Sequence, residues 1–194
     1  LKEGDRALLF VGLSPDLYAT IIGALSLGVT VLLVEPWMPL ERIAHVIRLT
    51  KPKVFVTGLL GRMWGVRIPE IRAIPHWVST AQLQTRAGPF APQDVDPQTP
   101  GILTFTSGTT GAPKGVVRNQ GYLMDQHRVL AQDLHLHDLP GPDLCIFANF
   151  ALSNLAAGRT SIVVPAGWKR RQLDELACLP AELHPVSTTC GPAF

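Results

Sequence analysis

The segment of this 194-residue sequence that is best suited to bind a ligand is a run of small, hydroxylated and glycine residues that ends in a lysine. It reads Ser-Gly-Thr-Thr-Gly-Ala-Pro-Lys and spans residues 107–114. Gly108 and Gly111 allow backbone conformations closed to other residues, so amide N–H groups can point at the oxygens of a bulky anion. The hydroxyls add further donors, and Lys114 adds a formal positive charge. This pattern predicts a cradle for phosphate groups.

Two runs of strand-forming residues flank the loop. Gly101–Thr106 precedes it and Gly115–Arg118 follows it. In the Walker phosphate loop a glycine directly precedes the lysine and a helix follows. Here Pro113 precedes Lys114 and a strand follows, which argues against a Ras-like or ATPase site. We therefore expect a hairpin whose turn binds the phosphates.

The first part of the chain must supply the scaffold for this hairpin. Its apolar patterns predict strands at 7–12, 29–34 and 53–57 and helices at 15–27 and 39–49. The strands are apolar throughout, as expected when both faces of a sheet are covered. A βαβαβ order predicts an α/β fold with a parallel sheet, right-handed crossovers and helices on both faces. Gly28 is expected to end the first helix.

The proline-rich stretch Ala87–Pro100 predicts an irregular surface connector. It would separate a βαβ sheet lobe at 1–86 from a second lobe at 101–194, which contains the hairpin and a further sheet. A strand is also expected at Ile74–Ser79. Gly121–Asp133 is expected to form a helix, with Asn119 as its N-cap.

Composition and charge exclude several classes of protein. Hydrophobic residues make up 46% of the sequence and charged residues 16%, which is typical of a globular chain. The net charge of +2, with no basic run longer than Lys169–Arg171, argues against a nucleic-acid partner. Three cysteines without CxxC spacing fit a reducing, cytoplasmic compartment and predict no cysteine metal site. Leu17–Val34 is uncharged and long enough to cross a bilayer, but Gly28 divides it, so we expect no transmembrane segment.

From Leu103 to Lys114 the sequence resembles, at every position, the AMP-binding signature of the acyl-adenylate-forming superfamily. That superfamily contains acyl-CoA synthetases, adenylation domains of non-ribosomal peptide synthetases and firefly luciferase. The resemblance implies an ATP site that binds Mg²⁺ through the nucleotide phosphates, a small carboxylic acid as co-substrate, and coenzyme A as one acceptor. It implies catalytic roles for Thr106 and Lys114. The implied phosphate ligands are Thr106, Ser107, Gly108, Thr109, Thr110, Gly111 and Lys114.

The resemblance extends over nearly the whole chain. Residues 142–165 are similar to a fatty-acyl ligase subgroup that includes the β-lactone synthetases of the long-chain olefin pathway. By this resemblance Phe147, Phe150 and Asn154 would line an acyl pocket, while core packing is the alternative for the aromatic side chains. Many members have a histidine five or six residues after the signature lysine. This chain has Asn119-Gln120 there, which puts any role of that histidine in doubt.

Three functions stay open at this point. The first is ATP-dependent activation of a carboxylic acid, chiefly a fatty acid, to an acyl-adenylate with transfer to an acceptor. The second is a β-lactone-forming synthetase acting on a β-hydroxy acid, and the third is an inactive fragment. Family members continue with adenine, ribose and magnesium contacts and a mobile C-terminal domain. We expect the chain to be a partial N-terminal domain that lacks these segments and is poorly soluble alone.

Overall fold

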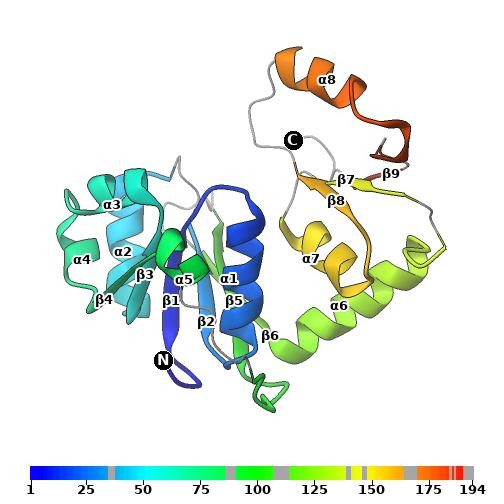
Figure 1. Ribbon diagram of the computed structural model, residues 1–194. Helices are drawn as coiled ribbons and strands as arrows, with labels where there is room; N and C mark the ends of the chain where they lie inside the picture. The colour runs from blue at the N-terminus through cyan, green and yellow to red at the C-terminus, as the bar shows by residue number, and fades with distance from the viewer. Residues whose placement is uncertain are drawn as a thin grey trace. The chain divides into compact units, whose positions relative to one another are not determined.

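A computed structural model describes residues 1–34, 38–85, 91–106, 114–138, 141–145, 148–163, 170–183, 185 and 187–189. The chain divides into two compact units. The first comprises Leu1–Val11 and Pro15–Leu123, and the second comprises Gly12–Ser14 and Met124–Phe194. Each unit contains a sheet of its own (Figure 1).

The first unit is built on a six-stranded sheet in the order β4-β3-β1-β2-β5-β6. The strands are β1 (Arg6–Phe10), β2 (Thr30–Leu33), β3 (Val54–Thr57), β4 (His76–Ser79), β5 (Pro100–Thr106) and β6 (Lys114–Asn119). Neighbouring strands are parallel from β4 to β5, and β6 pairs antiparallel with β5. The expected parallel βαβαβ arrangement is therefore confirmed, with one antiparallel strand added at the β6 edge.

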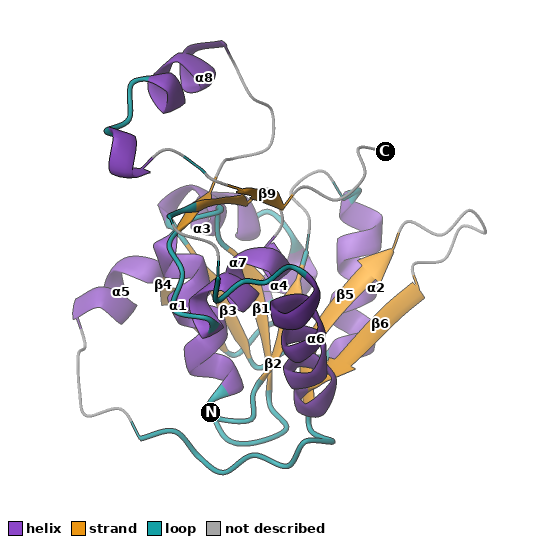
Figure 2. Ribbon diagram, turned by 90° about the vertical axis from the view of Figure 1, so that its right-hand side faces the viewer, coloured by secondary structure: helices purple, strands orange, loops and turns teal. Residues whose placement is uncertain are grey.

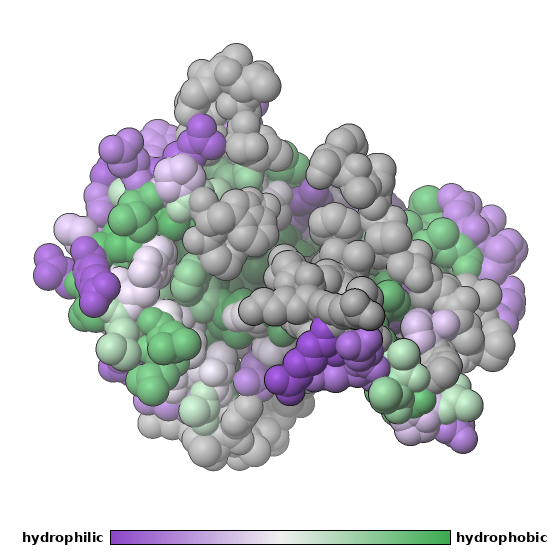
Figure 3. All heavy atoms as spheres, turned by 90° about the horizontal axis from the view of Figure 1, so that it is seen from above, coloured by the Kyte–Doolittle hydropathy of each residue, from purple (hydrophilic) through white to green (hydrophobic). Residues whose placement is uncertain are grey.

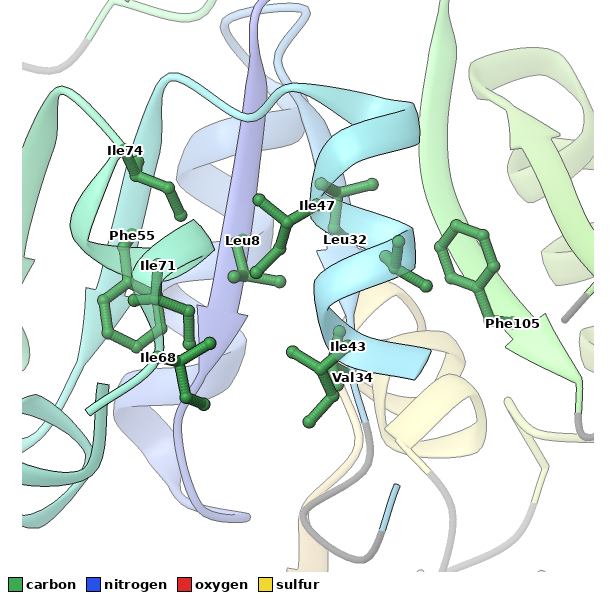
Figure 4. Packing of buried hydrophobic residues seen from close by; sticks show 11 residues of the cluster. Leu8, Leu32, Val34, Ile43, Ile47, Phe55, Ile68, Ile71, Ile74 and Phe105 are labelled. Atoms are coloured by element: carbon green, nitrogen blue, oxygen red, sulfur yellow. The ribbon is translucent and has the colours of Figure 1, made fainter. Parts of the chain in front are cut away.

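Helices α1 (Pro15–Leu25) and α2 (Leu40–Thr50) cover opposite faces of this sheet. The strand order explains why. The chain moves one way from β1 to β2 and the other way from β2 to β3, so right-handed crossovers put the two helices on different faces. On the α2 face, Ile43 and Ile47 belong to a buried cluster that also contains Leu8, Phe55 and Phe105 (Figure 4). Three shorter helices follow: α3 (Leu59–Gly65), α4 (Pro69–Arg72) and α5 (Thr80–Thr85).

The uncharged run Leu17–Val34 is divided between α1 and β2, as predicted. Gly28 has φ +67° and stands at the turn, where Val29 N–H donates to the Ala24 carbonyl. Only glycine adopts this left-handed conformation without a steric cost, so the helix ends here. Within the described part of the chain, no helix is long and apolar enough to cross a membrane.

The second unit holds a parallel three-stranded sheet in the order β8-β7-β9. Its strands are β7 (Asp143–Cys145), β8 (Ser161–Val163) and β9 (Ser187–Thr189). Its helices are α6 (Gln120–Asp133), whose first turn belongs to the first unit, α7 (Ala148–Ala156), α8 (Arg170–Ala177) and the 3₁₀ turn Ala181–Leu183. A buried polar cluster joins α7 to this sheet, because Asn154 Nδ2 donates to Asp143 Oδ2 at 2.8 Å and to Ser161 Oγ at 3.2 Å.

Candidate phosphate-binding hairpin

The hairpin of β5 and β6 brings the two ends of the predicted phosphate loop together. Thr106 is the last residue of β5 and Lys114 the first of β6, and their Cα atoms are register partners. Figure 2 shows the two strands side by side. Residues that are directly opposite in an antiparallel pair have Cα atoms about 4.5–5.5 Å apart. The two ends of the predicted loop therefore lie close together, and the seven residues between them are outside the described part of the chain.

Strand β5 ends, and β6 begins, at the edge of the sheet where ligands of α/β proteins bind. β5 is parallel to β2, with Val31, Leu32 and Leu33 opposite Ile102, Leu103 and Thr104. Thr106 therefore ends β5 at the carboxyl edge shared by the parallel strands. In open α/β sheets, ligands bind in the crevice outside the carboxyl ends of the strands. The exposed side chain of Lys114 starts from this edge.

One face of the hairpin is anchored in the hydrophobic core. Phe105 is buried and belongs to the cluster that α2 covers. Gly115 is its register partner, and a Cβ built there would stand 3.2 Å from Phe105 Cε1. Glycine at this position therefore leaves room for the aromatic ring. Because Phe105 directly precedes Thr106, packing of the ring fixes the strand end from which the loop departs.

Arg118 is a site residue that the sequence did not single out. Its Nη1 donates to Thr104 Oγ1 across the hairpin at 2.9 Å. Arg118 and Lys114 are four residues apart on one strand, so both lie on the same face of β6. The hairpin thus presents two cationic side chains on one face. The even spacing between Lys114 and Arg118 was the only feature of the sequence that could have indicated Arg118. Its bond to Thr104 depends on the register of the two strands.

The helix after the hairpin begins where predicted. Asn119 Oδ1 accepts from the Tyr122 backbone N–H at 2.7 Å, the bond that defines an N-cap. The Gln120 side chain donates to the Leu25 carbonyl at 3.0 Å and ties this helix start to the end of α1. Asn119 and Gln120, which occupy the positions where many superfamily members have histidine, therefore hold the start of α6 in place here.

The structure describes the other predicted site residues to different extents. Ser107, Gly108, Thr109, Thr110 and Gly111 lie outside the described residues, as does Phe147. For Thr106 the structure describes the strand position only. Phe150 is half-buried on α7, and Asn154 is 1% exposed within the polar cluster with Asp143 and Ser161. The acyl-pocket roles of Phe147, Phe150 and Asn154 stay predictions.

Among the described residues, no group of three or more His, Cys, Asp or Glu side chains is arranged to hold a metal ion. His135 contacts the exposed carboxylate of Asp138 at 3.5 Å. The charged side chains of β5 and β6 are the cations Lys114 and Arg118, which suit the oxygen atoms of an anion.

Comparison with known proteins assigns a family to the chain. A family model described as AMP-binding enzyme matches residues 1–187. An indoleacetate–CoA ligase from Aromatoleum aromaticum is 38% identical over an alignment of 98 positions, gaps included, that covers 46% of this chain and 19% of the ligase. An olefin β-lactone synthetase from Xanthomonas campestris is 25% identical over an alignment of 204 positions, gaps included, that covers 98% of this chain and 36% of the synthetase.

The fold also matches a solved enzyme. The o-succinylbenzoate CoA synthetase MenE from Bacillus subtilis, in complex with its acyl-adenylate intermediate, superimposes with a TM-score of 0.78 at 15% identity. The match covers 100% of this chain and 57% of that one. The chain thus spans about a fifth to a third of the length of these curated relatives. Since the family model covers nearly all of its residues, the chain belongs to the AMP-binding enzyme family.

Proposed function

We propose that the protein uses ATP to activate a carboxylic acid as an acyl-adenylate. One observation carries the proposal. The hairpin that bears the family signature sets Thr106 opposite Lys114 at the carboxyl edge of the parallel sheet. Both ends of a glycine- and hydroxyl-rich loop thus meet at the edge where α/β folds bind ligands.

In the proposed reaction, a carboxylate oxygen attacks the α-phosphorus of ATP. The bond from that phosphorus to the bridging oxygen breaks, and pyrophosphate leaves with the bonding electrons. The barrier is electrostatic, because an anion approaches a polyanion. Thr106, Ser107, Gly108, Thr109, Thr110 and Gly111 would hold the β- and γ-phosphates through amides and hydroxyls, and the Lys114 ammonium would offset their charge. Mg²⁺ would neutralise further charge on the same phosphates.

A fatty acid is our first choice of substrate, and a β-hydroxy fatty acid is the alternative. The alternative draws support from the alignment with the olefin β-lactone synthetase, which covers 98% of this chain. The indoleacetate–CoA ligase is more similar over a shorter stretch, so aromatic acids belong in the test. Phe147, Phe150 and Asn154 are the proposed acyl-pocket residues, and coenzyme A is the proposed acceptor for the simple fatty acid.

The test is pyrophosphate–ATP exchange by the full-length protein with a panel of straight-chain, β-hydroxy and aromatic acids. We expect Mg²⁺-dependent exchange that requires one class of acid. Product analysis without coenzyme A separates the two fatty substrates, because only a β-hydroxy acid has a hydroxyl that can close a β-lactone. A folded protein that exchanges with no acid in the panel would refute the proposal.

A further inference from the structure

Helix α3 exposes its large apolar side chains to solvent. Leu59, Leu60 and Met63 are 75%, 82% and 60% exposed, and Val66 directly after the helix is 50% exposed. A surface helix normally turns such residues toward the core. In α3 the buried positions are held by Gly61 and Gly65 instead. Helix α3 therefore turns its large apolar residues to solvent and its glycines to the sheet, which is the reverse of the usual arrangement.

Close packing against the sheet explains why glycines occupy the inner face. A Cβ built on Gly61 would lie 1.9 Å from Thr57 Oγ1 and 2.9 Å from Phe10 Cδ1. A Cβ on Gly65 would lie 3.0 Å from the Phe55 ring. The helix backbone therefore rests directly on the sheet, which leaves no room on that side for a leucine. The outward apolar residues are held in place by a well-packed inner face.

Cationic side chains surround the exposed apolar residues. A groove of about 540 Å³ beside α3 is lined by Leu59, Arg62, Met63, Val66, Arg72 and Trp77. Arg62, Arg67 and Arg72 are exposed, and within the part of the chain that the structure describes none of them forms an ion pair. Figure 3 shows hydrophobic and hydrophilic residues next to one another at its left-hand end, where α3 lies in Figure 1.

A second groove nearby differs in charge. Two of its cations are paired, since Arg48 contacts Glu70 and Lys53 contacts Asp5. The α3 face (Leu59, Leu60, Arg62, Met63, Val66, Arg67 and Arg72) combines unpaired positive charge with protruding apolar groups. The ligand that complements both is an anionic head group attached to hydrocarbon.

We propose that the α3 face docks on a lipid bilayer that carries anionic head groups. The side chains of Leu59, Leu60 and Met63 would enter the boundary between head groups and acyl chains, while the guanidinium groups bind lipid phosphates. Anionic lipids attract each arginine near the surface. A protein partner fits less well, because a stable interface takes about 20–30 residues from each side and this face has seven.

The proposed docking face is independent of the proposed catalysis. α3 and α4 lie between β3 and β4 in the chain, and β4 is at the opposite edge of the six-stranded sheet from β6. A substitution on the α3 face therefore leaves the hairpin untouched. A protein that does not bind lipid could still use ATP, and a protein that does not use ATP could still bind lipid.

The test is flotation of the full-length protein with vesicles, which separates bound protein from aggregates because aggregates do not float. Vesicles contain either phosphatidylcholine alone or equal parts of phosphatidylcholine and phosphatidylglycerol. Leu60→Ser with Met63→Ser removes inserted side chains, and Arg62→Gln with Arg67→Gln removes charge. The matched control is Arg128→Gln with Val129→Ser on α6, whose side chains are 71% and 56% exposed.

We expect binding to the anionic vesicles that falls about tenfold or more in either α3 double variant and is unchanged in the control. Binding should also weaken at about 0.5 M salt, because the arginine contacts are screened. Three results would each overturn the proposal: no flotation with anionic vesicles, equal flotation of all variants, or a concentration-dependent dimer in ultracentrifugation that Leu60→Ser with Met63→Ser abolishes. The last result would assign the face to a second copy of the chain.

Discussion

Lys114 is the residue on which charge neutralisation at the hairpin depends. It begins β6 opposite the end of β5, and its side chain is exposed at the carboxyl edge of the sheet. Arg118 shares its face of the strand, and its Nη1 donates to Thr104 Oγ1 across the hairpin. Arg118 thus ties the two strands together, and we propose that Lys114 contacts the phosphates of the ligand.

Replacing Lys114 tests this division of roles. We predict that Lys114→Met lowers acid-dependent pyrophosphate exchange by about 100-fold, since one preorganised charged contact to the reacting phosphates is lost. Lys2→Met, at another exposed lysine, is the matched control and should leave exchange unchanged. Exchange rates are measured at saturating acid over a range of ATP concentrations. Equal exchange rates in the two variants would show that Lys114 does not act in the reaction.

Asp5 and Lys53 form an ion pair that makes stability depend on pH. Lys53 Nζ donates to Asp5 Oδ1 at 2.6 Å, and the Lys2 backbone N–H donates to the other oxygen at 3.0 Å. The Lys53 hydrogen bond is the main reason that the pKa of Asp5 is lowered from 3.8, although burial opposes it. A lowered carboxyl pKa stabilises the fold above its unfolded pKa, and that stability is lost as pH falls through the folded pKa.

We predict that Lys53→Met destabilises the protein at pH 7 and raises the Asp5 pKa toward its ordinary value. The destabilisation relative to wild type should disappear below the folded pKa of Asp5, where the carboxyl is protonated in both proteins. A carboxyl NMR titration measures the Asp5 pKa, and urea unfolding at pH 7 and at a pH below that pKa measures the difference in stability. A stability difference that is the same at both pH values would contradict this role for the pair.

At the scale of elements, helix packing depends on where glycines meet the sheet. Gly61 in α3 and Gly23 in α1 have opposite surroundings. A Cβ on Gly61 would clash with Thr57 Oγ1 at 1.9 Å, whereas a Cβ on Gly23 would meet nothing within 4 Å. The Thr57 hydroxyl also donates to the Phe10 carbonyl at 2.8 Å, so moving it away breaks a bond between β3 and β1.

The same substitution should therefore have opposite effects in the two helices. We predict that Gly61→Ala destabilises the protein by about 1–3 kcal/mol through overpacking. Gly23→Ala should stabilise it by about 0.5–1 kcal/mol, because alanine loses less backbone entropy in a helix. Denaturant unfolding of the two variants gives both values. A shift of stability in the same direction for both substitutions would contradict the close packing of α3 on the sheet.

The elements with strong periodic signals could be predicted from the sequence. Apolar runs gave β1, β2 and β3 to within two residues at each end, and Gly28 and Asn119 marked helix ends through their local chemistry. The short helices α3 and α4 were not predicted, because Gly61, Gly65 and Pro69 are poor helix formers. Strands of three residues, such as β7 and β8, are too short to show a period.

The site was predictable only where its residues are contiguous. The loop and its lysine form one motif, so the sequence defined both ends, and the register of β5 and β6 agrees with a hairpin. Arg118 was missed because its contact with Thr104 exists only when that register is set. The cluster of Asn154, Asp143 and Ser161 joins three separate elements, and no local pattern could reveal it.

At the scale of the whole molecule, β6 is an edge strand of the six-stranded sheet and bears exposed valines. Val117 is 58% exposed and Val116 is 39% exposed. An exposed apolar edge strand is a site for self-association. We predict that the 194-residue chain expressed alone elutes above its monomer size, and that Val117→Lys shifts it toward the monomer. Size-exclusion chromatography with light scattering measures both, and a wild-type chain that is monomeric and melts cooperatively would contradict the prediction.

Nucleotide protection of the hairpin would test the proposed ATP site most directly. Hydrogen–deuterium exchange of the full-length protein, with and without Mg²⁺–ATP, reports the amides of residues 101–118 against those of β4 at the other edge. We predict slower exchange in the hairpin peptides, no change in β4, and loss of the effect in Lys114→Met. Protection that spares the hairpin would show that the triphosphate binds elsewhere, and hairpin protection that survives in Lys114→Met at full strength would contradict the role of Lys114.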